Sequence, residues 1–154
     1  MMDFNKNIIP FEGIGDFKLY GNFENIKSLF KGQGINYNIE EQSNKGCNPP
    51  VPWKIIRVKD TISMIFAKEK LFEIYVEKNF TGKLPNGIYV GMSLEEAKEI
   101  DKSLTFNDWE ECYESNLGYW LEDNLDDGTV MSITIFIKEI TDDDEFFSYK
   151  WCEK

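Results

Sequence analysis

Two stretches with alternating side chains decide the fold: VMSITIFIKEI at residues 130–140 and LFEIYVEK at residues 71–78. In the first, every second residue from Ile133 to Ile137 is an isoleucine. Such alternation is typical of a β-strand with one buried face. The second stretch and a strand predicted over 61–67 flank Lys68-Glu69-Lys70, which predicts a β-hairpin.

A helix is predicted ahead of each of these strand regions. Asn22 is a favourable N-cap for FENIKSLFK. Ser93 with Glu96 forms a capping box, and this second helix is expected to run to about Leu104. The apolar residues expected to face inward are Phe23, Ile26, Leu29 and Phe30 in the first helix and Leu94, Ala97, Ile100 and Leu104 in the second.

The two helix starts lie 71 residues apart, and the strong strands follow them in the same order. With short strands expected at 14–20 and 87–91, this order favours a tandem β-α-β-β-β repeat. The predicted fold class is therefore α+β, with two helices packed on a mainly antiparallel sheet. We expect one compact domain over residues 1–154, with repeat halves at 12–80 and 85–140.

Composition excludes several kinds of active site. The 154 residues include no histidine, which rules out imidazole-based triads and zinc sites with histidine ligands. Arg57 is the only arginine, and Cys47, Cys112 and Cys152 are too widely spaced for a Cys-x-x-Cys metal or redox motif. We therefore expect no catalysis, no cofactor and no metal. A carboxylate-based hydrolase is the enzyme class that composition still allows.

The sequence has no apolar run long enough for a signal peptide or a membrane span, which favours a soluble, cytoplasmic protein with no membrane partner. Its charge is uneven. Residues 1–84 hold 12 basic and 10 acidic residues, whereas residues 85–154 hold 5 basic and 18 acidic ones. Because nucleic acids and anionic membranes require a cationic surface, this acidic half argues against both as partners and favours a basic protein.

Large aromatic residues interrupt the acidic run at residues 108–127, and this combination is typical of a protein-binding surface. The candidate partner-binding residues are Asp108, Trp109, Glu110, Glu111, Tyr113, Glu114, Glu122, Asp123, Asp126 and Asp127. The alternative is that Trp109 and Tyr113 lie in the core and the acids only face solvent. The loop 43–53 is a second possible binding surface.

The acidic loop DNLDDG at residues 123–128 has some features of a calcium-binding loop. However, Leu125 occupies the third position, where an EF-hand requires an oxygen ligand, and Thr134 occupies the twelfth, where it requires a bidentate glutamate. Asp-Gly between two alternating apolar stretches instead predicts a hairpin turn.

The segment GIYVGMSLEEAKEID (87–101), followed by the acidic aromatic stretch and GYWLEDN (118–124), resembles small immunity proteins of bacterial polymorphic-toxin and contact-dependent growth inhibition systems. The doubled helix-and-sheet layout is also similar in architecture to tandem-repeat protein inhibitors of enzymes. The first resemblance implies a role but assigns no residue.

That role is the binding and neutralisation of a cognate protein toxin with a basic surface. A nuclease-type toxin fits best, since its phosphate-binding groove must be cationic. Two alternatives stay open: a non-catalytic protein-binding module, such as a phage-type inhibitor of another cationic protein, and a carboxylate-based hydrolase.

Overall fold

Eight antiparallel strands form the main sheet of the computed structural model, which describes residues 6–44 and 51–153. In chain order they are β4 (Asn38–Asn44), β5 (Val51–Val58), β6 (Ile62–Ala67), β7 (Lys70–Glu77), β8 (Thr105–Asn107), β9 (Cys112–Glu114), β10 (Tyr119–Asn124) and β11 (Thr129–Phe136). In space their order is β4-β5-β6-β7-β11-β10-β9-β8. None of the helices in the described ranges is long and apolar enough to cross a bilayer. Cys47 and most of the loop 43–53 lie outside the described residues.

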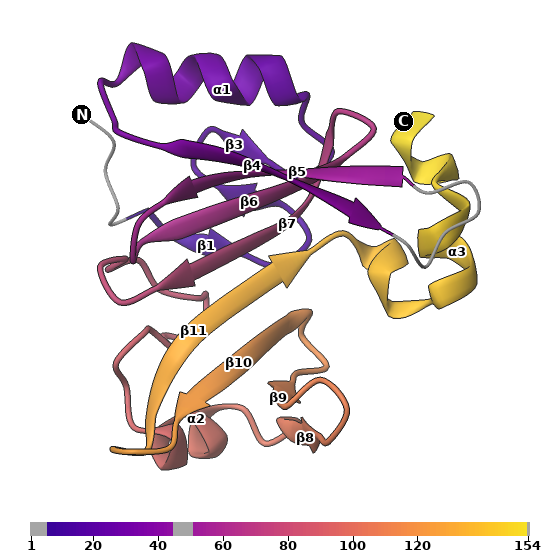
Figure 1. Ribbon diagram of the computed structural model, residues 1–154. Coiled ribbons are helices and arrows are strands. Elements are labelled where there is room, and N and C mark those ends of the chain that lie inside the picture. The colour runs from indigo at the N-terminus through magenta and orange to yellow at the C-terminus, as the bar shows by residue number, and fades with distance from the viewer. Residues whose placement is uncertain (1–5, 45–50, 154) are drawn as a thin grey trace.

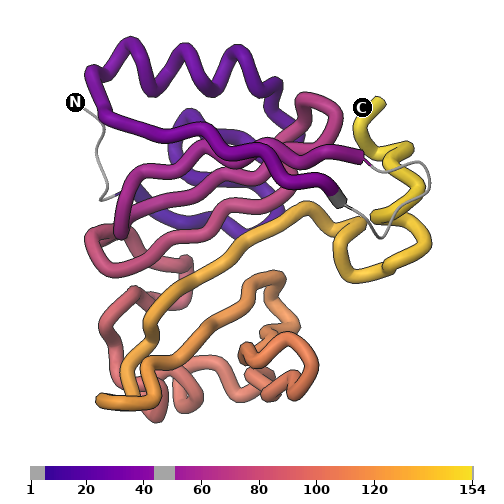
Figure 2. The backbone as a smooth tube through the Cα atoms, viewed as in Figure 1, coloured from indigo at the N-terminus to yellow at the C-terminus, as the bar shows by residue number. Residues whose placement is uncertain are grey.

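The main sheet is built from two units, each consisting of a helix followed by four strands. Helix α1 (Phe23–Gly32) precedes β4–β7, and α2 (Leu94–Ile100) precedes β8–β11. The last strands of the two units, β7 and β11, pair with each other and join the units into one sheet. Figures 1 and 2 show the first unit in violet to magenta and the second in orange. The predicted α+β class is confirmed.

The short strands expected before the helices are not part of the main sheet, so that detail of the repeat was wrong. Residues near 14–20 instead supply two strands of a small three-stranded sheet, β1 (Ile8–Ile9), β2 (Gly13–Ile14) and β3 (Phe17–Lys18). Residues 87–91 form no strand beyond an isolated bridge between Tyr89 and Lys83, because Gly87 and Gly91 adopt φ values of 94° and 100°, which extended strands do not contain.

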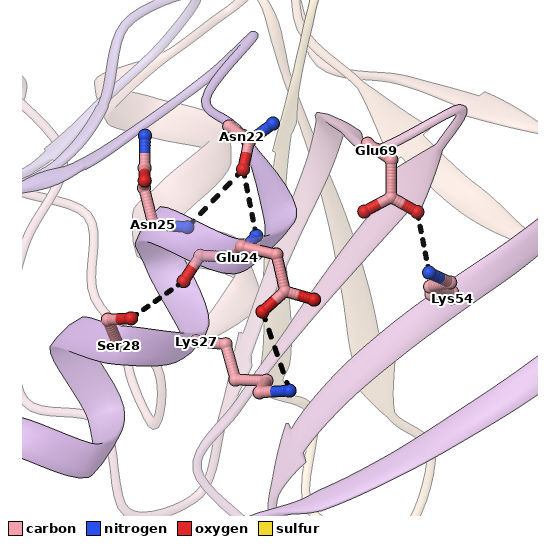
Figure 3. A network of polar contacts seen from close by, with 7 residues as sticks. All are labelled: Asn22, Glu24, Asn25, Lys27, Ser28, Lys54 and Glu69. Atoms are coloured by element: carbon pink, nitrogen blue, oxygen red, sulfur yellow. Dashed lines mark hydrogen bonds and ion pairs between the residues drawn. The ribbon is translucent and has the colours of Figure 1, made fainter.

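Helix α1 begins as its sequence predicts. The side chain of Asn22 accepts hydrogen bonds from the backbone N–H groups of Glu24 (2.9 Å) and Asn25 (3.4 Å), as Figure 3 shows. Phe23, Ile26 and Phe30 are buried beneath the helix, as expected. Across the sheet, Lys54 and Glu69 form an ion pair at 2.5 Å, drawn in the same view.

Helix α2 is shorter than expected and exposes a residue predicted to be buried. Leu94 and Ala97 face inward, but Ile100 is 44% exposed. The helix ends at Asp101 rather than near Leu104, because Asp101 is extended and its carboxylate accepts hydrogen bonds from Ser103. This local bonding replaces the next helical turn.

The C-terminal segment forms structure that the alternation did not predict. Strand β11 ends at Phe136 rather than Ile140. It is followed by a 3-10 helix (Lys138–Thr141), α3 (Asp143–Ser148) and a second 3-10 helix (Lys150–Glu153). An aromatic cluster holds this segment against the sheet, with Phe72 5.1 Å from Phe146 and 5.0 Å from Trp53 between ring centroids. Because these contacts join residues far apart in sequence, local periodicity does not reveal them.

Both predicted hairpin turns are present. Lys68 and Glu69 adopt left-handed φ values of 47° and 70° between β6 and β7. The DNLDDG segment connects β10 to β11, with the turn at residues 125–128.

Candidate functional site

The predicted binding residues gather at one end of the second unit. In an antiparallel meander, every second turn lies at the same end of the sheet. The β8–β9 turn (108–111) and the β10–β11 turn (125–128) are therefore neighbours, separated by the pairing of β9 with β10. The acidic residues of both turns consequently face one region of space.

The side chain of Asn107 organises the β8–β9 turn. Its Oδ1 accepts hydrogen bonds from the backbone N–H groups of Trp109 (2.9 Å) and Glu110 (3.1 Å). Its Nδ2 donates to Glu114 Oε1 at 2.8 Å. Glu111 completes the turn with a left-handed φ of 54°. Local polar bonding therefore holds this turn in place of apolar packing.

Two turn residues are exposed to an unusual degree. Trp109 is 95% exposed and Leu125 is 90% exposed, more than any other large hydrophobic side chain in the described residues. Trp109 therefore does not lie in the core, whereas Tyr113, which the same alternative placed there, is half-buried and packs against the core. Exposed aromatic and aliphatic side chains of this kind are typical of binding surfaces.

A hollow of about 600 Å³ lies between the two turns, and we call it the acidic hollow. Its lining residues are Phe106, Asp108, Glu110, Glu111, Tyr113, Glu122, Asp123, Leu125 and Met131. Five of the nine are acidic, and the other four present aromatic or aliphatic surface. The combination offers a partner negative charge and packing area in the same place.

The ten predicted binding residues divide into three groups. Six of them line the acidic hollow: Asp108, Glu110, Glu111, Tyr113, Glu122 and Asp123. Trp109, Asp126 and Asp127 are exposed in the turns beside it. Glu114 is half-buried in β9 and is engaged by Asn107, so it supports the turn.

Three apolar lining residues were missed by the sequence analysis: Phe106, Leu125 and Met131. Leu125 carried a signal, since a leucine inside an acidic turn has no neighbour in sequence to pack against. Met131 carried no signal in the sequence. It lies where the pairing of β10 with β11 shifts by one residue near Glu122 and Asp123, and only this shift explains why it lines the hollow.

A buried hydrogen-bond network supports the acidic hollow. The carboxylate of Asp101 accepts hydrogen bonds from the hydroxyls of Ser103, Ser115 and Tyr119, which tie the end of α2 to the chain around β9 and β10. Burial works against the charged form, but these hydrogen bonds outweigh it and lower the pKa of Asp101. Burial and the bond to Asp101 raise the pKa of Tyr119 to about 12.

Glu73 on β7 is a carboxyl group that the sequence analysis did not single out. It is half-buried, and burial together with the charges of Glu122 and Glu110 raises its pKa to about 7. Glu73 does not line the acidic hollow. Glu110 and Glu122, whose negative charges help to raise the pKa of Glu73, do line the hollow.

The two cysteines in the described residues do not form a reactive centre. Burial, with the negative charge of Glu114 next in importance, raises the pKa of Cys112 to about 11. Burial also raises the pKa of Cys152 to about 11. Both thiols therefore stay protonated at neutral pH, and a thiolate nucleophile is not supported at either position. No group of three potential metal ligands is found among the described residues.

A second hollow of about 570 Å³ lies beside α2, and the exposed Ile100 is one of the residues that line it. Its lining residues are Met92, Ser93, Glu95, Glu96, Glu99 and Ile100. It shares the acidic and aliphatic character of the acidic hollow but presents no aromatic side chain.

Comparison with known proteins assigns no function. No model of a known protein family matches the chain, and no curated protein matches it. One solved structure with a similar fold is that of the uncharacterized protein yfeY from Escherichia coli. It superposes with a TM-score of 0.54 at 10% sequence identity, over 84% of this chain and 99% of that chain. At this identity the likeness concerns the fold alone.

Proposed function

We propose that this chain is a non-catalytic inhibitor of the immunity-protein type, which neutralises a basic nuclease-type toxin in the cytoplasm by binding it through the acidic hollow. One observation carries the proposal. The two most exposed large apolar side chains of the described residues, Trp109 and Leu125, stand in the two turns that border a hollow with five acidic lining residues.

The two kinds of side chain have different physical roles in this proposal. Trp109 and Leu125 supply area that loses water on contact, and tryptophan is prominent among residues that dominate binding energy. The carboxylates supply long-range attraction to a cationic groove, which accelerates association and selects the partner. A toxin inhibitor benefits from both, since it must find its target quickly and hold it.

A carboxylate-based hydrolase is the second candidate, and Glu73 is the observation in its favour. A general acid needs a raised pKa, and Glu73 has one close to neutrality beside Glu122. A substrate in the acidic hollow would nevertheless meet Glu122 without meeting Glu73, because Glu73 is not part of the lining. Binding is therefore the better supported function.

Site-specific photo-cross-linking tests the proposal. The purified chain with benzoylphenylalanine in place of Trp109 is irradiated in an extract of the source cells, and cross-linked proteins are identified by mass spectrometry. The matched control carries the same group in place of Phe147 on α3, which is 46% exposed and lies outside the acidic hollow.

We expect a basic protein captured from position 109 and not from position 147, with a nuclease activity that the intact chain inhibits. Capture of the same proteins from both positions, or a captured protein whose activity the chain leaves unchanged, overturns the proposal.

A further inference from the structure

The two faces of the main sheet differ in character, and the strand register shows which residues share a face. In an antiparallel sheet, directly paired residues lie on one face and successive residues alternate between faces. Three rows of paired residues cross what we call the polar face. They are Glu122–Ser132–Glu77, then Glu114–Trp120–Thr134–Tyr75–Ser63–Arg57, then Phe136–Glu73–Ile65–Ile55–Glu40.

The opposite face carries most of the core, although five residues of the polar-face rows are buried as well: Ile55, Ser63, Ser132, Thr134 and Phe136. Its rows are Leu121–Ile133–Val76–Ile62–Val58 and Tyr119–Ile135–Ile74–Met64–Ile56–Ile39. Helix α1 packs on this side, with Phe23 5.1 Å from Phe66 between ring centroids. Helix α2 reaches it through Lys98, whose Nζ lies 5.1 Å from the centroid of Tyr113, the partner of Leu121. Helices therefore pack on the face that carries both long apolar rows.

The polar face meets the acidic hollow at Glu122, whereas Tyr113, another lining residue, pairs with Leu121 on the opposite face. Glu122 belongs to both, and its Oε1 accepts a hydrogen bond from Ser132 Oγ at 2.7 Å on the adjacent strand. The next strand, β7, presents Glu73, Tyr75 and Glu77, all half-buried. Two strand spacings, ~10 Å in total, separate β10 from β7. A protein surface that fills the hollow is wide enough to reach them.

The charge on this face is unbalanced. Its three rows hold five carboxylates but one cationic side chain, Arg57, which is engaged by Glu40 through two nitrogens at 3.3 Å. The charges that raise the pKa of Glu73 are both negative: Glu110 from the β8–β9 turn and Glu122 from β10. Its paired neighbours on β6 and β11 are the uncharged Ile65 and Phe136.

We infer that the polar face from Glu122 to Glu73 and Glu77 is the second part of the docking surface, and that it receives basic side chains from the same protein that occupies the acidic hollow. This inference rests on the proposed function and defines the partner further. The partner presents a convex basic surface that spans both hairpin turns and β7. Its cations supply positive charge to a face whose three rows hold five carboxylates and one cationic side chain.

Nuclear magnetic resonance with hexalysine as the probe tests the inference. An extended hexalysine is ~20 Å long, which is enough to bridge the acidic hollow and Glu73, whereas dilysine, at ~7 Å, is too short. The side-chain carboxyl carbons are titrated at low salt with no peptide, with dilysine and with hexalysine. Glu145, exposed on α3, is the internal control.

We expect hexalysine to shift Glu110, Glu122 and Glu73 together, to lower the pKa of Glu73, and to affect Glu145 less. Glu73→Gln should weaken hexalysine binding at pH 8 by about two- to fivefold, the effect of one partly screened charge pair, while Glu145→Gln leaves binding unchanged.

A response of Glu110 and Glu122 without Glu73 overturns this inference and leaves the proposed function standing. A probe that shifts Glu145 as strongly as Glu73 also overturns it, because the attraction is then general. If none of the hollow or polar-face carboxylates responds, the proposed function fails as well.

Discussion

Asn107 Oδ1 accepts a hydrogen bond from the backbone N–H of Trp109 at 2.9 Å, so the side chain of Asn107 holds the backbone that carries the most exposed aromatic side chain of the described residues. The same oxygen also accepts from Glu110. Tryptophan binds best when its position is set before contact, since less conformational entropy is then lost on binding. The turn thus holds the backbone of Trp109 in a defined conformation, although the side chain of Trp109 packs against little.

Asn107→Ala should loosen the turn without unfolding the sheet. Both hydrogen bonds to Oδ1 are lost, so amide exchange at Trp109 and Glu110 should accelerate about tenfold or more, with a stability loss of ~1 kcal/mol. Hydrogen exchange and urea unfolding measure the two effects. Asn107→Asp is the matched control, because it keeps the acceptor oxygen while losing the donor to Glu114. Equal exchange rates in both variants would contradict this account.

Trp109→Ala should weaken partner binding while leaving the fold as stable as before. Its side chain is 95% exposed, so its removal opens no cavity. If it is an anchor in the interface, its loss should cost ~2 kcal/mol or more of binding free energy, mainly as faster dissociation. Surface plasmon resonance with the protein captured from position 109 measures this. Phe147→Ala should leave the dissociation rate unchanged.

Replacing Asp108, Glu110, Glu111 and Glu114 together by Asn or Gln should slow association rather than speed dissociation. Long-range attraction is reduced, so the association rate should fall by about tenfold or more at low salt and by less at high salt. Rates across a salt series check this. The control replaces Asp143, Asp144 and Glu145 on α3 in the same way. A rate independent of salt, or equal loss in the control, would mean that the acids act in solubility alone.

Asp101→Asn should destabilise the second unit and remove part of its sensitivity to acid. The pKa of Asp101 is lowered in the folded state, so its negative charge stabilises the fold at pH values above the ordinary pKa of an aspartic acid. That contribution is lost as the pH falls through the folded pKa. We expect a loss of ~1–3 kcal/mol at pH 7 and a smaller difference from the native chain in acid. Urea unfolding at pH 7 and pH 3 measures both. Tyr119→Phe, which removes one donor, should have a smaller effect at pH 7.

Glu73→Gln should stabilise the protein at high pH and not at low pH. Because the folded-state pKa is raised to about 7, the native state holds a proton that the unfolded chain has already released. Native stability therefore falls as the pH rises from about 4.5 towards 7, and the glutamine variant escapes this loss. We expect it to gain no more than ~3 kcal/mol at pH 8 and little at pH 4. Thermal unfolding at the two pH values tests this, and an equal gain at both would show a packing effect instead.

Much of the fold could be predicted from sequence because its signals are local. The Asn22 and Ser93 caps bond to backbone groups within three residues, so their residue types alone mark the helix starts. The alternation in β7 and β11 and the two hairpin turns are local in the same way. The acidic and aromatic composition of residues 108–127 was likewise sufficient to select candidate binding residues, of which six line the acidic hollow.

The tertiary structure decided which of those residues meet. The antiparallel meander brings residues 108–111 beside residues 122–125, and that arrangement depends on strand pairing rather than on any local pattern. Glu73 shows the limit most clearly. In the sequence it is one polar residue in an alternating strand, and its raised pKa arises because folding buries it and places it near Glu122 and Glu110, 49 and 37 residues away along the chain. Electrostatic interactions depend on distance in space. The charges that act on a residue can therefore be identified only when the pairing of all the strands between them is known.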